Sequence, residues 1–84
     1  MGKKAYIIQF EMTEVFGSAQ KAAEYLKGYY SSFDWSIDSY ADELDGRDLS
    51  DVSTGELKEL LKRKNHFFLL SGREEVRVYV REIQ

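Results

Sequence analysis

Two stretches of alternating residues near the C-terminus constrain the fold most, because together they specify an antiparallel pair of strands. Residues 66–70 are mainly aromatic and aliphatic, and Val76, Val78 and Val80 alternate with charged or aromatic residues over 74–83. Ser71-Gly72-Arg73 lies between the stretches and has a composition typical of a hairpin turn. The sequence therefore predicts strands over 66–71 and 74–83, with one side of the second strand formed by Glu75, Arg77, Tyr79 and Arg81.

The N-terminal half adds one strand and one helix. Residues 4–12 alternate as expected for a strand, and Gly17-Ser18 ends that pattern. Ser18 is a suitable N-cap for a helix over 18–31, in which small, aliphatic and aromatic residues recur at three- and four-residue steps. A second start signal is the capping box formed by Ser53 and Glu56, which predicts a helix over 54–64.

Residues 33–45 fit two templates. Ile37, Tyr40, Ala41 and Leu44 have the spacing of an amphipathic helix, whereas Phe33, Trp35 and Ile37 alternate as in a strand. The longer match favours a helix over 36–44. The chain of 84 residues has no cysteine and no apolar run long enough to span a membrane. We therefore expect a single cytoplasmic α+β domain over 1–84, with a three-stranded antiparallel or mixed sheet and two to three helices packed on one face.

Signatures of catalysis and of bound cofactors are absent from the sequence. It has no phosphate-binding glycine loop and no nucleophile elbow. The single histidine, His66, has no serine or cysteine pattern around it. A calcium loop centred on Gly46 would place Ala41 and Val52 at ligand positions, which neither residue can fill. The sequence therefore predicts no enzyme, no cofactor and no metal site.

The charges are strongly segregated. All six aspartates lie between positions 34 and 51, and residues 34–56 carry seven net negative charges, whereas the whole chain carries −3 and the remainder therefore +4. On a helix, steps of three and four residues would place the carboxylates on one side. We therefore expect a non-enzymatic module that occupies a basic, nucleic-acid-binding surface of a partner protein. The predicted contact residues are Asp34, Asp38, Asp42, Glu43, Asp45, Asp48 and Asp51.

Such a nucleic-acid mimic would be analogous to the small viral inhibitors of CRISPR or restriction systems. The analogy rests only on the small size and the acidic charge of the chain, and on no sequence motif. The competing interpretation is an acidic segment that only keeps the protein soluble. A second functional alternative uses Arg77, Tyr79 and Arg81 to bind single-stranded nucleic acid, although the acidic balance of the chain argues against direct binding. The interpretation that competes with this alternative is an ordinary polar face, on which Glu75 and Glu82 pair with these arginines.

A third alternative is a generic interaction module. Twelve aromatic residues, 14% of the chain, exceed what a small core can bury, and Tyr29, Tyr30, Trp35 and Tyr40 are the candidates for a docking patch. Such a patch would allow a homodimer.

Overall fold

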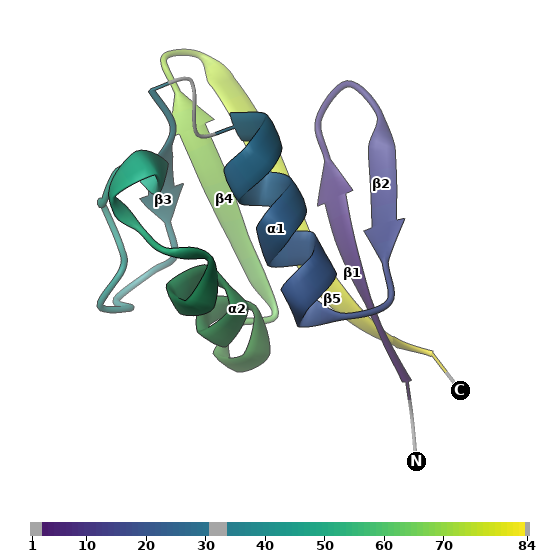
Figure 1. Cartoon of the computed structure of the whole chain (residues 1–84). Coiled ribbons are helices and arrows are strands. Elements are labelled where there is room, and N and C mark those ends of the chain that lie inside the picture. The colour runs from purple at the N-terminus through teal and green to yellow at the C-terminus, as the bar shows by residue number, and fades with distance from the viewer. Residues whose placement is uncertain (1–2, 31–33, 84) are drawn as a thin grey trace.

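The computed structural model describes residues 3–30 and 34–83, which form one sheet and two α-helices (Figure 1). In chain order the elements are β1 (Lys3–Gln9), β2 (Thr13–Phe16), α1 (Ala19–Tyr30), β3 (Ser36–Asp38), the 3₁₀ helix η1 (Leu49–Asp51), α2 (Thr54–Arg63), β4 (His66–Ser71) and β5 (Glu74–Ile83). The predicted α+β class and the C-terminal hairpin are confirmed. No helix in the described part of the chain is long and apolar enough to cross a membrane.

The sheet has five strands rather than the expected three, in the order β2-β1-β5-β4-β3, and all neighbours are antiparallel. One additional strand arises because the predicted strand over 4–12 ends early. After Gln9 the Phe10 amide donates to the Met12 carbonyl at 3.1 Å, and the chain returns as β2. Residues 10–12 contain no Gly, Pro, Asn or Asp, so the sequence has no conventional signal for this turn.

The other additional strand is β3, and the predicted helix over 36–44 is wrong. Ser36–Asp38 pairs with β4, which buries Ile37 opposite Leu69. Tyr40 and Ala41 then adopt left-handed backbone angles, with φ of 52° and 59°, and these angles are incompatible with a right-handed helix. Leu44 is buried as expected, but Tyr40 is 85% exposed.

Residues 46–49 cover the outer edge of β3. The Ile37 amide donates to the Arg47 carbonyl at 2.9 Å, and the Leu49 amide donates to the Trp35 carbonyl at 2.8 Å. The Gly46 amide donates to the Ile37 carbonyl at 2.7 Å. The backbone groups on this edge are therefore largely paired within the chain.

Both predicted helix starts are confirmed. The Ser18 hydroxyl accepts a hydrogen bond from the Lys21 amide at 3.1 Å. Ser53 and Glu56 form the predicted capping box, with the Ser53 amide donating to Glu56 at 3.0 Å and the Glu56 amide donating to Ser53 at 3.1 Å. Position 31, the predicted end of the first helix, lies outside the described residues.

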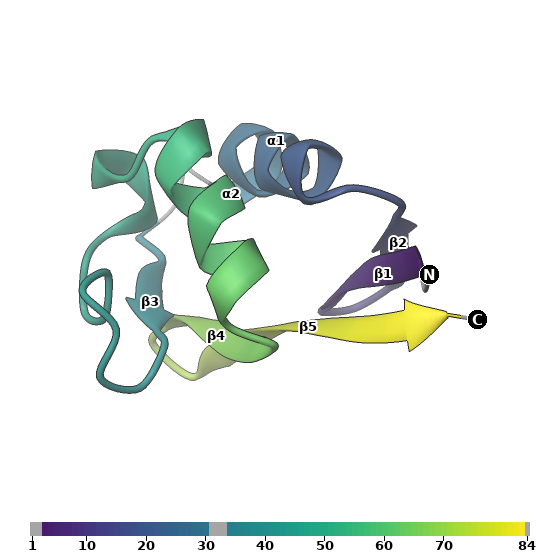
Figure 2. The ribbon, with the colours of Figure 1, turned by 90° about the horizontal axis from the view of Figure 1, so that it is seen from below.

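The two helices cover the same face of the sheet (Figure 2). The core forms between the helices and this face, where Leu26, Leu57 and Leu60 are fully buried against Val76 and Val78. Each fully buried leucine contributes about 1.5–3 kcal/mol. We call the other side of the sheet the open face. From strand alternation and register, its central residues are Ala5, Ile7, Gln9, His66, Phe68, Leu70, Glu75, Arg77, Tyr79 and Arg81.

Candidate binding surfaces

The acidic segment, residues 34–51, contains β3, the loop after it and the short 3₁₀ helix η1 instead of the predicted α-helix. Its carboxylates therefore do not form the helical series that the spacing suggested. Asp42 forms a bidentate ion pair with Arg63, whose Nε and Nη2 donate to the two carboxylate oxygens at 2.7 and 2.8 Å. The Asp42 side chain is only 7% exposed and also accepts the Leu44 amide at 3.0 Å. The Arg63 hydrogen bonds outweigh desolvation and lower the pKa of Asp42 to about 2.

Other members of the segment also have structural roles. Asp45 accepts the Ser39 amide at 2.8 Å, and Glu43 lies 3.8 Å from Arg63. Within residues 3–30 and 34–83, five of the predicted contact residues form no ion pair: Asp45, which accepts the Ser39 amide, and Asp34, Asp38, Asp48 and Asp51.

Basic side chains of the same molecule also hold the backbone of this segment. Lys27 Nζ donates to the Leu49 carbonyl at 3.0 Å, and Lys64 Nζ donates to the Tyr40 carbonyl at 3.0 Å. Arg47 donates to the Asp51 carbonyl at 3.0 Å and lies 3.4 Å from Glu56. Part of the negative charge is therefore compensated internally, and several aspartates fulfil the ordinary hydrogen-bonding roles of this residue in loops.

The open face carries the second predicted set of residues. Alternation along β5 places Arg77, Tyr79 and Arg81 together on it. The Arg81 guanidinium lies 5.5 Å from the centre of the Tyr79 ring, within the range of a cation–π interaction. Together with His66, these three side chains line a shallow depression of about 410 Å³.

Two further rings extend this surface across the neighbouring strand. His66 stands opposite Tyr79 and Phe68 stands opposite Arg77. The centre of the His66 ring is 4.7 Å from that of Phe68 and 6.3 Å from that of Tyr79. The sequence suggested an aromatic neighbour from this strand, but it left open whether Phe67 or Phe68 would share the face. The register settles this point, since Phe67 is buried in the core.

The arginines of the open face lack the carboxylate partners that the competing interpretation requires. In the part of the chain that the structure describes, neither Arg77 nor Arg81 forms an ion pair. Glu82 stands opposite Lys4 and alternates to the helix side of the sheet. Glu75 shares the open face with Arg77, two residues away along β5 and nearer the turn, but forms no ion pair with it. Both guanidinium groups are therefore available to an external anion.

The expected aromatic docking patch is only partly formed. Trp35 and Tyr30 are buried in the core, whereas Tyr29 and Tyr40 are exposed by 61% and 85%. Tyr29 stacks on Tyr25, with ring centres 5.3 Å apart, whereas Tyr40 has no ring contact with any described residue.

In comparisons with known proteins, no protein-family model, no curated protein and no solved structure matches the chain.

Proposed function

We propose that the chain is a non-enzymatic binding module whose open face binds single-stranded nucleic acid. The observation that carries the proposal is the combination of three rings with two guanidinium groups that have no internal carboxylate partner among the described residues. Exposed rings on a sheet can stack with unpaired bases, each stack contributing about 1–3 kcal/mol. Arginines beside such rings can neutralise the phosphates that join the bases.

The arrangement of charge on the molecule is compatible with this proposal despite the acidic total. The arginines lie on β5, at the centre of the sheet, whereas the acidic segment lies around β3 at one edge. Asp38 shares the open face and pairs with Phe68 in the β3–β4 register, so it marks the side on which phosphates would be repelled. A bound strand would therefore lie over β4, β5 and β1.

Fluorescence anisotropy with a labelled single-stranded DNA or RNA of about ten nucleotides at low salt tests this proposal. We expect Arg77→Gln combined with Arg81→Gln to weaken binding about tenfold or more. The double variant should also lower the salt slope by about 1.4, because each lost contact to a single strand accounts for about 0.7.

Lys21→Gln combined with Arg73→Gln is the matched control, because it removes the same charge from exposed positions outside the depression. This control should change affinity less than threefold. The absence of saturable binding, or an equal loss in both double variants, would contradict the proposal.

A second candidate function is the occupation of a basic protein surface by the acidic segment. It is favoured by Asp34, Asp38, Asp48 and Asp51, whose carboxylates have no ion-pair partner in residues 3–30 and 34–83. Protein partners would be captured from the native host and identified by mass spectrometry. Asp38→Asn combined with Asp48→Asn and Asp51→Asn should abolish salt-sensitive capture, and unchanged capture would exclude this function. Asp42 is left intact in this test because of its bond to Arg63.

A further inference from the structure

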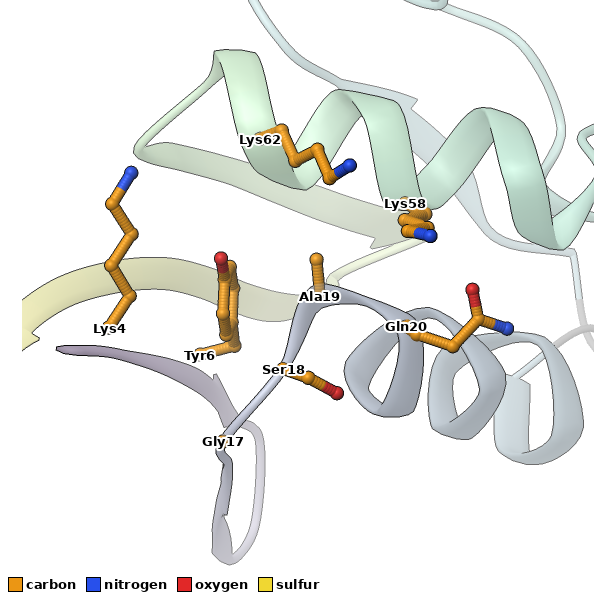
Figure 3. Close-up of a pocket in the computed structure, with 8 residues that line it drawn as sticks. All are labelled: Lys4, Tyr6, Gly17, Ser18, Ala19, Gln20, Lys58 and Lys62. Carbon is orange, nitrogen blue, oxygen red and sulfur yellow. The ribbon is translucent and has the colours of Figure 1, made fainter.

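A second basic surface lies on the helix side of the sheet, near the beginning of β1. It is a depression of about 460 Å³ bounded by β1, the start of α1 and one side of α2 (Figure 3). The side chains of Lys4 from β1 and of Lys58 and Lys62 from α2 contribute to its lining. Because β1 and α2 are far apart in the sequence, no local motif indicates this convergence. We refer to it as the lysine pocket.

The positive charge of the lysine pocket is largely uncompensated. No carboxylate lines it, and in the described residues neither Lys4 nor Lys58 forms an ion pair. Glu82 stands opposite Lys4 in the sheet register but forms no ion pair with it. Lys62 Nζ lies 3.6 Å from Glu59, and both side chains of this pair are more than half exposed. Such an exposed pair is weak and can exchange for a better anion.

The N-terminus of α1 adds backbone donors to the lysine pocket. The Ser18 hydroxyl and carbonyl accept the amides of Lys21 and Ala22. The amides of Ala19 and Gln20, whose residues line the pocket, have no acceptor among residues 3–30 and 34–83. Unpaired amides at the positive end of a helix dipole favour a bound anion.

Tyr6 adds a hydroxyl donor to the lysine pocket from a third direction. The residue is 8% exposed, and its hydroxyl points from β1 into the lysine pocket, between Lys4 and Lys62 (Figure 3). The described part of the chain offers this hydroxyl no hydrogen-bond partner. The Tyr6 oxygen is not among the fully buried polar atoms that lack a partner, so it is open to the pocket and can donate a hydrogen bond to an oxygen of a bound anion.

We propose that the lysine pocket binds a phosphate group. The residues that line it supply three ammonium groups, two helix N-terminal amides and a phenolic hydroxyl from three elements, and such donors suit an anion with several oxygens. The pocket lies on the opposite side of the sheet from Arg77 and Arg81, so this inference goes beyond the proposed function and does not depend on it.

The phosphate could belong to a free compound or to the 5′ end of a nucleic-acid strand, and titrations can separate these sources. Inorganic phosphate, a nucleoside 5′-monophosphate and paired 5′-phosphorylated and 5′-hydroxyl oligonucleotides would be titrated into the full chain. Backbone amide NMR shifts report the site directly, and we expect saturable shifts at Ala19 and Gln20. A preference for the 5′-phosphorylated strand would support a strand end, and equal saturation by the small phosphates would support a free compound.

Variants test whether the lysine pocket causes these shifts. Lys58→Gln combined with Lys62→Gln should weaken phosphate binding about tenfold or more. Tyr6→Phe keeps the ring in the core and should weaken it about threefold or more. The matched control, Lys21→Gln combined with Arg73→Gln, should change it less than twofold.

No saturable shift with any phosphate compound, or an equal loss in the control, would overturn the inference. Arg77→Gln combined with Arg81→Gln should leave the Ala19 and Gln20 shifts intact. This last variant separates a failure of the lysine pocket from a failure of the open face.

Discussion

The bond between Asp42 and Arg63 allows a quantitative prediction about folding stability. The drop in the pKa of Asp42 from 3.8 to about 2 corresponds to at most about 2–3 kcal/mol. Arg63 is about one-third exposed, so solvent screening reduces the expected contribution to about 1 kcal/mol. Asp42→Asn should therefore lower the melting temperature by about 4–8 °C at neutral pH.

The same variant should show a defined pH dependence. Because the pKa of Asp42 is lower in the folded than in the unfolded chain, its contribution is complete above pH 3.8 and disappears as the pH falls through about 2. Circular dichroism during urea unfolding would measure the difference between wild type and Asp42→Asn from pH 7 to pH 2. The gap should close at the acidic end, and Asp48→Asn, which removes an unpaired exposed carboxylate, should stay within about 0.5 kcal/mol of wild type throughout. A gap that persists at pH 2, or no gap at pH 7, would refute the reasoning.

Three further predictions concern other residues. Ala41→Gly should stabilise the fold by about 0.5–1 kcal/mol in urea unfolding, because glycine relieves the φ of 59° at some entropic cost; a loss of stability would contradict this. Ser53→Ala should cost about 1 kcal/mol by breaking the capping box, whereas Ser50→Ala should be nearly neutral, and equal costs would argue against the cap. Burial raises the pKa of Tyr30 to about 12, so ultraviolet titration should show one late tyrosine that Tyr30→Phe removes. The contribution of this raised pKa to folding stability is present below pH 10.0 and is lost as the pH rises through about 12. A titration curve that Tyr30→Phe leaves unchanged would contradict the assignment.

The elements that sequence reasoning predicted correctly are those with local causes. The capping box needs only Ser53 and Glu56, and the C-terminal hairpin needs only alternation and a turn around Gly72, whose φ is +60°. β3 could not be predicted in the same way. The helical spacing of Ile37, Tyr40 and Leu44 is real, but pairing with β4 and the hydrogen bonds of residues 46–49 determine the backbone there. Aspartate is also a poor helix former, so the competing helix was intrinsically weak.

The candidate sites show the same difference between local patterns, which the sequence reveals, and contacts between elements, which it does not. A period of two along β5 was enough to place Arg77, Tyr79 and Arg81 on one face. The contacts of His66 and Phe68 with that face depend on the β4–β5 register, which the sequence alone did not establish. The lysine pocket depends on the packing of α1 against both α2 and β1, and no local pattern in the chain encodes that arrangement.

The covering of β3 by residues 46–49 has a consequence for self-association. Growth of a sheet from molecule to molecule requires two different free edges, and here one of them is occupied by the chain itself. The four-residue strand β2 forms the opposite edge. Two copies could join there symmetrically, β2 against β2, and such a pair would expose no further edge for a third copy. Any assembly built through the sheet should therefore stop at a dimer instead of extending into a fibre.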